Sequence, residues 1–259
     1  VSIVPGVGLG KSWARLLAMV AAWSGIAALI IALMKARAGG TALAFAIYLK
    51  EYMKSAGVKA RFIRGGSTKY LVEMLEEGLT DYILDGQTFD LEGVRSMREN
   101  RGHVNTSPFT SYNYHGKGNF ASMLDCVVLG ATEVDVNFNA NVVTHSDGYL
   151  LHGIGGWQNC LFSKCTILPI PAFRDRIPVL VDEVTTLVGP GELIDVVVTE
   201  RGIAINPRRK DLLDAVKDPA VGGSIVLGGV VHVGHVDREV AAVRSQHETL
   251  VAADHIVQA

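Results

Sequence analysis

The chain has 259 residues, of which 49% are hydrophobic, and its 24 basic and 26 acidic residues leave a formal net charge of −2. This length suffices for one large domain or two small ones, and the balanced charge excludes the basic footprint of a nucleic-acid-binding protein. Cys126, Cys160 and Cys165 form neither an even disulfide framework nor zinc-binding doublets, which favours a reducing, cytoplasmic compartment. His232 and His235 have no third ligand nearby in the sequence, so we expect no metal site.

The N-terminal segment differs from the rest. Residues 16–34 are uncharged and long enough to span a bilayer, so a signal peptide or a membrane anchor is one interpretation. We favour a core helix or an atypical chain start. Residues 2–4 resemble a strand followed by a phosphate-binding loop, but Pro5 replaces the first glycine and has no N–H, so nucleotide binding is not expected. We therefore divide the chain into an atypical apolar segment, residues 1–37, and one α/β domain, residues 38–259.

Beyond residue 38, helices alternate with short strands. The hydrophobic spacing predicts helices at residues 42–55, 69–78 and 207–216. A glycine-rich loop is predicted at 65–68, and residues 91–120 read as a polar, irregular stretch. The β-loop-α-β order predicts a mostly parallel sheet with crossover helices. The predicted strands are 59–63, 82–85, 126–129, 165–170, 177–181, 184–188, 193–199 and a pair within 225–236, followed by weak helix at 239–253.

The residues most suggestive of chemistry follow the buried strand at 126–129. Glu133 and Asp135 lie at its polar end, and a glycine-rich loop with Gly155 and Gly156 comes after a turn at residues 146–148. A carboxylate can attack or orient an acyl group, and glycine amides can stabilise an oxyanion, so this layout suits acyl transfer. The alternatives are a solvated surface acid and a plain turn. The asparagines between them either satisfy loop backbone groups or orient a substrate carboxylate: Asn137, Asn139 and Asn141.

Several ordered motifs carry a resemblance to a known family. They are LDCVVLGATEVDVNFNANV, then GIGG, then RIPVLVDEVTTLVGPGELIDVVVTERGIAINPRRKDL, preceded by ARAGGTALAFAIYLKEYMKSAGVKARFIRGGSTKYLVEMLEEGL and DGQTFDLEGVRSMRENRGHV. This series, roughly residues 38–217, resembles the C-terminal half of the citrate lyase α subunit, the citrate CoA-transferase of the CoA-transferase superfamily. The resemblance implies a CoA-transferase-like α/β sandwich with a mostly parallel sheet flanked by helices.

The resemblance also implies a reaction and partners. The reaction would exchange acetyl for citrate on an acyl-carrier-protein or CoA thioester, releasing acetate. No cofactor would be bound permanently, because the CoA or phosphopantetheine thioester is itself a substrate. The implied partners are the citrate lyase β and γ (acyl carrier) subunits within an oligomer, and a separate N-terminal half.

The resemblance assigns roles to particular residues. Glu133 stands where the superfamily places its catalytic glutamate, which attacks the thioester to form an anhydride; in the lyase subgroup a direct mixed anhydride between substrate carboxylate and acetyl group is the alternative. The amides of Gly155 and Gly156 would bind the oxyanion. The substrate-binding positions would be Asn139, Asn141, Trp157 and Asn159.

Two departures from the family pattern favour an alternative function. The family loop reads Gly-Gly-His, a small residue and Asp, whereas Trp157 and Asn159 stand here, which removes an imidazole and a carboxylate. The bulky Trp157 would also stand where the substrate approaches. The matching N-terminal half is not found in residues 1–37. The alternative is therefore a catalytically silent CoA-transferase half that binds a partner subunit.

Overall fold

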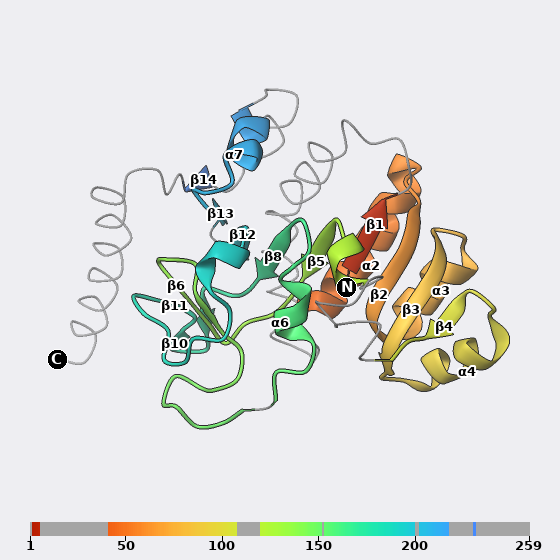
Figure 1. The fold of residues 1–259 in the computed structure, drawn as a ribbon, viewed down its shortest axis with the longest axis horizontal. Coiled ribbons are helices and arrows are strands. Elements are labelled where there is room, and N and C mark those ends of the chain that lie inside the picture. The colour runs from red at the N-terminus through yellow and green to blue at the C-terminus, as the bar shows by residue number, and fades with distance from the viewer. Residues whose placement is uncertain are drawn as a thin grey trace.

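The computed structural model describes residues 2–5, 41–107, 120–151, 153–199, 202–217 and 230–231. Nine strands form one sheet in the order β14-β13-β12-β8-β5-β1-β2-β3-β4 (Figure 1). Their bounds are β1 Ser2–Pro5, β2 Ala60–Ser67, β3 Thr80–Thr88, β4 His103–Asn105, β5 Cys126–Val128, β8 Thr166–Pro169, β12 Val196–Thr199, β13 Gly202–Ile205 and β14 Val230–Val231.

Most neighbouring strands of this sheet are parallel, as the sequence predicted. The pairs β2–β3, β3–β4, β5–β8, β8–β12 and β13–β14 are parallel, whereas β12–β13 is antiparallel. Strand β1 lies between β2 and β5 and is antiparallel to both. The strand predicted at residues 2–4 is thereby confirmed, and it joins two parallel groups of strands into one sheet.

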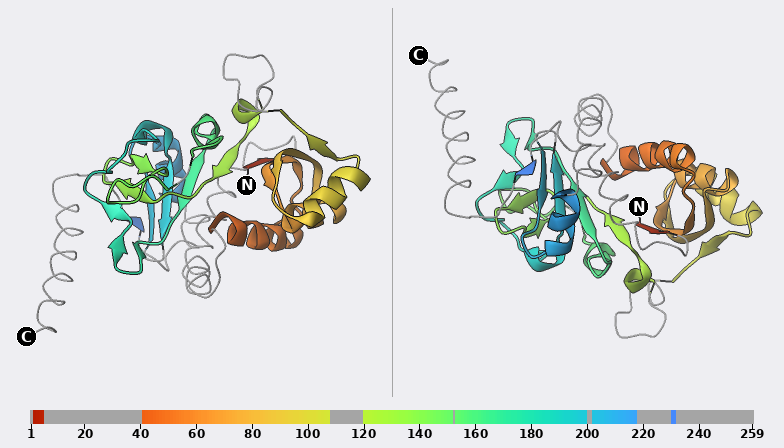
Figure 2. Two further views of the ribbon diagram at one scale, coloured as in Figure 1. Left: turned by 90° about the horizontal axis from the view of Figure 1, so that it is seen from below. Right: turned by 90° about the horizontal axis from the view of Figure 1, so that it is seen from above.

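The described part of the chain contains five α-helices, and three of them pack on this sheet through an extended apolar cluster. The five helices are α2 Thr41–Ala56, α3 Lys69–Glu76, α4 Leu91–Glu99, α6 Trp157–Cys160 and α7 Lys210–Lys217, with short 3-10 helices at Ala121–Met123 and Gly191–Leu193. Leu49 of α2, Leu71 of α3 and Leu212 of α7 belong to one buried cluster with Val196 and Val198 of β12. The helices predicted at 42–55, 69–78 and 207–216 are confirmed. Figure 2 shows α2, α3 and α4 gathered around β2–β4 at one end of the molecule.

A second apolar cluster lies on the other side of β12. Because strand side chains alternate between faces, Val197 points away from its neighbours and packs with Val134, Phe138, Trp157 and Leu168. This cluster carries a three-stranded sheet in the order β11-β6-β7, with β6 in the middle. The bounds are β6 Glu133–Asp135, β7 Ala140–Asn141 and β11 Leu180–Val181, and a hairpin of β9 Phe173–Arg174 and β10 Ile177–Pro178 lies beside it in the chain.

The structure corrects several sequence predictions. Gly65 and Gly66, predicted as a loop, continue β2 across a register shift, and the ring of Phe89 fills the space that a side chain at Gly66 would need. Glu133 does not end the strand at 126–129; it begins β6, a strand of the second sheet. Residues 184–188 form no strand, because their backbone bends over β6.

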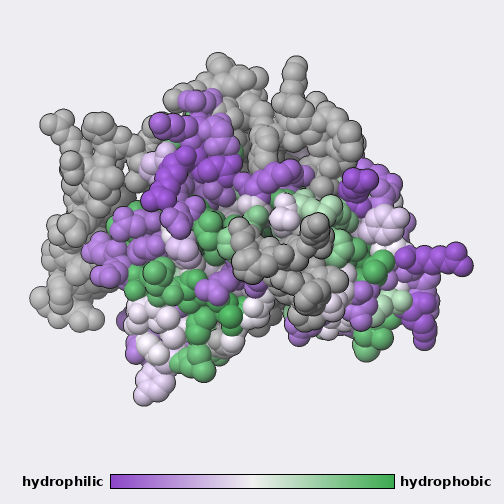
Figure 3. All heavy atoms as spheres, viewed as in Figure 1, coloured by the Kyte–Doolittle hydropathy of each residue, from purple (hydrophilic) through white to green (hydrophobic). Residues whose placement is uncertain are grey.

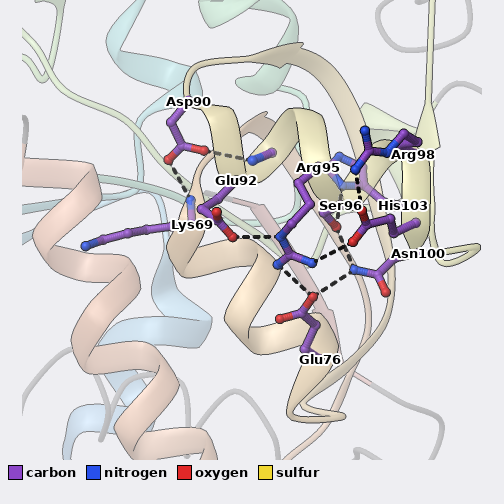
Figure 4. A network of polar contacts seen from close by, with 11 residues as sticks. Lys69, Glu76, Asp90, Glu92, Arg95, Ser96, Arg98, Asn100 and His103 are labelled. Atoms are coloured by element: carbon purple, nitrogen blue, oxygen red, sulfur yellow. Dashed lines mark hydrogen bonds and ion pairs between the residues drawn. The ribbon is translucent and has the colours of Figure 1, made fainter.

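The stretch predicted to be irregular contains α4 and β4, and polar contacts explain why. Asp90 precedes α4; its Oδ1 accepts a hydrogen bond from Gly93 N at 2.8 Å and its Oδ2 accepts one from Lys69 N at 2.7 Å. One carboxylate therefore caps the N-termini of both α4 and α3. Arg95 of α4 contacts Glu92 on its own helix and Glu76 of α3 (Figure 4). These contacts form a helix where hydrophobic periodicity gives a weak signal.

A buried polar chain fixes α4 to the sheet beneath it. Ser96 of α4 lies 2.9 Å from His103 Nδ1, and His103 Nε2 lies 3.3 Å from Asp85 Oδ2 of β3. Asp85 is fully buried and also accepts hydrogen bonds from the Ser67 and Thr88 hydroxyls. Burial opposes ionisation of Asp85, but these donors outweigh it and hold the pKa of this carboxyl below its ordinary value.

Several predictions fall outside the described residues. They include the whole apolar segment at 16–34, the histidines His232 and His235, and the weak helix at 239–253. Within the described ranges, no helix combines the length and apolar character that crossing a membrane requires.

Candidate active site

Glu133 occupies the first position of β6, the middle strand of the smaller sheet. Its side chain is only 1% exposed, so the interpretation as a solvated surface acid is wrong. Strand β7 pairs antiparallel with β6 and places Asn141 directly opposite Glu133. Strand β11 pairs parallel with β6 on the other side and leads into residues 182–187, which return over the carboxylate.

Four donor groups surround the Glu133 carboxylate. Asn141 Nδ2 donates to Oε2 at 2.9 Å, and the backbone N–H of Thr185 donates to the same oxygen at 3.1 Å. The Thr185 hydroxyl donates to Oε1 at 3.4 Å, and the Ser146 hydroxyl also donates to this carboxylate. Burial opposes ionisation of Glu133, but these hydrogen bonds outweigh it and hold its pKa below the ordinary value. The site therefore presents an ionised carboxylate in a neutral, polar setting.

Asn141 is fully buried and uses both ends of its amide within the protein. Besides Glu133, its Nδ2 donates to Thr144 O and Oγ1, and its Oδ1 accepts from the backbone N–H groups of Val143 and Thr144. The Thr144 hydroxyl in turn lies 2.9 Å from the Thr186 hydroxyl. Asn141 thus joins the carboxylate to both neighbouring segments, and its assignment to substrate binding stays a prediction.

Asn139 has a comparable structural role in the turn between β6 and β7. Its Nδ2 donates to Asp135 Oδ2 at 3.0 Å, and its Oδ1 accepts from Gly191 N at 2.9 Å. Asp135 Oδ1 also accepts from the backbone N–H groups of Asn137 and Asn139, and Phe138 in this turn adopts a φ of 66°. The interpretation that these asparagines satisfy loop groups fits Asn139 directly.

The glycine-rich loop leads into α6. Two side chains of this helix donate hydrogen bonds to backbone carbonyls that lie far from it in the sequence. Trp157 is buried, and its Nε1 donates to Gly130 O at 2.8 Å; Gln158 Nε2 donates to Val188 O at 2.6 Å. The indole therefore packs in the second apolar cluster, and the assignment of Trp157 to substrate binding stays a prediction. Gly155 is exposed with a φ of 56°, a left-handed conformation that favours glycine.

The structure brings some of the predicted site residues together and leaves others apart. Glu133 and Asn141 are in direct contact, whereas among the described residues neither Gly155 nor Gly156 makes a hydrogen bond to Glu133. Asn159 is half-buried in α6. The sequence interpretation missed Thr185 and Ser146, because the first lay in a run predicted as a strand and the second in a turn. No local pattern marks either residue as a partner of Glu133.

The fold belongs to a known class, the CoA-transferase-like α/β proteins. A solved α subunit of a malonate decarboxylase from Acinetobacter baumannii matches it with a TM-score of 0.54, covering 90% of this chain and 52% of that chain. At 16% identity this likeness is one of fold alone. A solved structure described as an α subunit of citrate lyase from Streptococcus mutans, in complex with citrate, gives a TM-score of 0.69 at 36% identity and covers 84% of this chain and 43% of that chain.

Sequence similarity identifies the family. The family model for "Citrate lyase, alpha subunit (CitF)" matches residues 18–227. The citrate lyase alpha chain of Escherichia coli (strain K12) is 34% identical over 236 residues, which are 87% of this chain and 46% of that protein. The corresponding chain of Haemophilus influenzae is 40% identical over 178 residues, 68% of this chain and 36% of that protein. The chain belongs to the citrate lyase α subunit family, and it spans less than half the length of these relatives.

Proposed function

We propose that this chain takes part in citrate CoA-transferase chemistry, exchanging acetyl for citrate on an acyl-carrier-protein or CoA thioester, with Glu133 as the catalytic residue. The observation that carries the proposal is a buried, ionised carboxylate surrounded by neutral donors in a member of this family. The Streptococcus mutans relative described in complex with citrate supports citrate as the acceptor.

The proposed covalent route keeps every atom accounted for. A Glu133 oxygen attacks the thioester carbonyl carbon, the C–S bond breaks, and the thiolate leaves an acetyl-glutamyl anhydride. The thiolate then attacks the glutamyl carbonyl and releases acetate. A citrate carboxylate attacks the glutamyl thioester in turn, and the returning thiolate takes the citryl group and frees Glu133. In the direct alternative, a citrate carboxylate attacks the acetyl thioester carbon and expels the thiolate, which gives a citryl-acetyl anhydride. The thiolate then attacks the citryl carbonyl and releases acetate, while Glu133 orients the reacting groups without forming a bond.

Other groups complete this proposal. The amides of Gly155 and Gly156 are candidate oxyanion donors, and the thioester is a substrate rather than a resident cofactor. The proposed partners are citrate lyase β and γ (acyl carrier) subunits and the part of the family chain that this sequence does not cover. A second candidate function, a silent half that binds a partner, is favoured by Trp157 and Asn159, which replace the polar pair expected from the resemblance.

The test is acyl exchange from acetyl-CoA to citrate by the full chain, alone and mixed with the remaining part of a relative's α chain. We expect Glu133→Gln to lower the rate of acyl exchange by about 1,000-fold or more, because no other group replaces the carboxylate that forms the covalent intermediate. Gln can fit the site, since its oxygen accepts from Asn141 and its amide nitrogen donates to the Thr185 and Ser146 hydroxyls. Glu51→Gln, an exposed acid of α2, is the matched control and should keep full activity.

The outcomes separate the two candidate functions. Exchange that needs Glu133 supports the transferase, whether or not the added part is required. Exchange at the wild-type rate by Glu133→Gln would refute Glu133 as the catalytic residue. A folded wild-type chain without exchange in either mixture would favour the silent, partner-binding subunit.

A further inference from the structure

We propose that residues 182–187, called here the cover segment, form a displaceable cover over Glu133, and that Thr185 is the positioning residue that holds this cover closed. The inference deepens the proposed function, on which its catalytic meaning rests, by naming the step that makes the carboxylate available. It also gives Thr185 and Asn141 separate tasks on opposite sides of Glu133.

The closed site does not admit a substrate. Covalent attack requires the thioester carbon within about 3–3.5 Å of the attacking oxygen, and Glu133 is only 1% exposed. On the inner side Asn141, itself fully buried, occupies the space beside Oε2. On the outer side lies Thr185, which is exposed. Of the described residues that contact the carboxylate, Thr185 and Ser146 are exposed, and Thr185 supplies two of the four donors, so displacing its segment opens a route for a thioester.

Polar contacts hold the cover segment down, with little apolar packing. Val184 N donates to Asp135 Oδ2 at 3.4 Å, and the Thr185 hydroxyl shares its one proton between Glu133 Oε1, at 3.4 Å, and Ser146 O, at 3.2 Å. The Thr186 hydroxyl meets that of Thr144. Leu187, the large apolar residue at its end, is 61% exposed. Segments with few buried apolar contacts open at low free energy, so this one can move without unfolding the core.

The two ends of the cover segment are fixed. Before it, β11 pairs with β6, matching Leu180 with Val134 and Val181 with Asp135. After it, the backbone N–H groups of Val188 and Gly189 both donate to Ala140 O, at 3.0 and 2.9 Å. The segment between these anchors can therefore lift while the sheet around Glu133 stays in place. Figure 3 shows hydrophobic residues gathered over the part of the molecule that carries β6 and β11.

Opening would change the carboxylate selectively. Lifting the cover removes the Thr185 N–H from Oε2 and the Thr185 hydroxyl from Oε1, while Asn141 Nδ2 keeps its hold on Oε2. The carboxylate becomes exposed on the side that Thr185 covered, and Asn141 and the Ser146 hydroxyl keep the side chain oriented. Because hydrogen bonds to a carboxylate stabilise its charged form, losing them makes the exposed oxygen more reactive.

The test measures Glu133 directly rather than through turnover. The folded full chain is treated with a water-soluble carbodiimide and glycine amide, and amidation of each acid is followed by peptide mass spectrometry. We expect slow labelling at Glu133 and fast labelling at Glu183, the exposed acid of the same segment. Thr185→Ala should speed Glu133 labelling by about 5- to 10-fold, the factor that one hydrogen bond of ordinary strength is worth. Thr185→Ser keeps the hydroxyl and should restore protection.

Ser55→Ala is the matched control, because its exposed hydroxyl bonds Tyr52 O in α2, outside the cover segment. Wild-type labelling of Glu133 as fast as that of Glu183, no increase in Thr185→Ala, or an equal increase in Ser55→Ala would each overturn the inference. If labelling follows expectation but the wild-type chain shows no acyl exchange, the cover stands and the proposed function fails. If acyl exchange depends on Glu133 but Thr185→Ala leaves the labelling rate of Glu133 unchanged, the cover inference alone is refuted.

Discussion

At the scale of single residues, Asn141 shows how one buried amide fixes a reactive carboxylate. Its nitrogen donates to Glu133, and its oxygen accepts from two backbone N–H groups. Its surroundings therefore require an amide at this position and determine which end of the amide faces Glu133. Trp157 illustrates the converse. The resemblance implies that its bulk faces the substrate, and in the structure its indole is buried and donates its N–H to Gly130 O.

We expect Asn141→Asp to convert Glu133 into half of a carboxylate pair. The new oxygen replaces a donor 2.9 Å from Oε2, and two carboxylates at that distance share one proton. The pair's pKa then lies above that of the unfolded residues, so the stability of the variant is retained below the unfolded values of about 4 and is lost as pH rises through the raised folded pKa.

Urea unfolding at pH 4.5 and pH 7.5 measures this effect. The deficit in unfolding free energy relative to the wild type should grow to about 3 kcal/mol at the higher pH, where a buried charge lacks its donor. Asn105→Asp, at the exposed last position of β4, is the control and should show no such growth. A deficit independent of pH would contradict the shared proton.

At the scale of elements, the turn at residues 189–191 is where the second apolar cluster meets the β6–β7 loop. Added side chains have no room there: one at Gly189 would meet the Trp157 ring, and one at Gly191 would meet the backbone of Asn137. Asn206 Nδ2 donates to Gly191 O at 2.7 Å and fastens the same turn to the end of β13. The turn at residues 189–191 can therefore support the β6–β7 loop only because its glycines let the two backbones come close together.

Gly191→Ala should therefore lower the unfolding free energy by about 3 kcal/mol, since a rigid backbone cannot yield as a flexible side chain does. Gly153→Ala is the matched control, because open space surrounds that position and its φ is not positive. Thermal or urea unfolding of the two variants checks the expectation. Equal stability of both would show that the loop at Asn137 relaxes freely.

At the scale of the whole molecule, two buried acids with lowered pKa values lie in different layers. Glu133 belongs to the three-stranded sheet and Asp85 to β3 near the edge of the nine-stranded sheet. Each contributes stability that is present above its unfolded pKa of about 4 and is lost as pH falls through its lower folded value. The unfolding free energy of the wild type should accordingly decrease from pH 5 toward pH 3.

Asp85→Asn should flatten this acid dependence. The amide brings a donor among the donors of Ser67, Thr88 and Gln87, so we expect a loss of about 2 kcal/mol at pH 7 that shrinks toward pH 3. Urea titrations at several pH values measure the slope. An unchanged slope would mean that Asp85 does not titrate differently in the folded and unfolded chains.

The sequence by itself determined the family and most of the regular elements. Hydrophobic spacing located α2, α3 and α7, and β-branched runs located β5, β8 and β12, because those patterns depend on local burial period. Polar contacts that span the sequence decided the rest: α4 formed where periodicity was weak, since Asp90 and Arg95 bind neighbours on α3. The position of β1 in the middle of the sheet is likewise a matter of topology.

The candidate site divides in the same way. Glu133 was predicted from its motif, but its burial and its partners were decided only by the tertiary structure. Thr185 lies 52 residues away in the chain and reaches Glu133 because β11 pairs with β6. No local pattern encodes such a contact, since the pairing of strands distant in sequence depends on the packing of the whole core. Sequence determined which carboxylate stands here, and the tertiary structure decided what covers it.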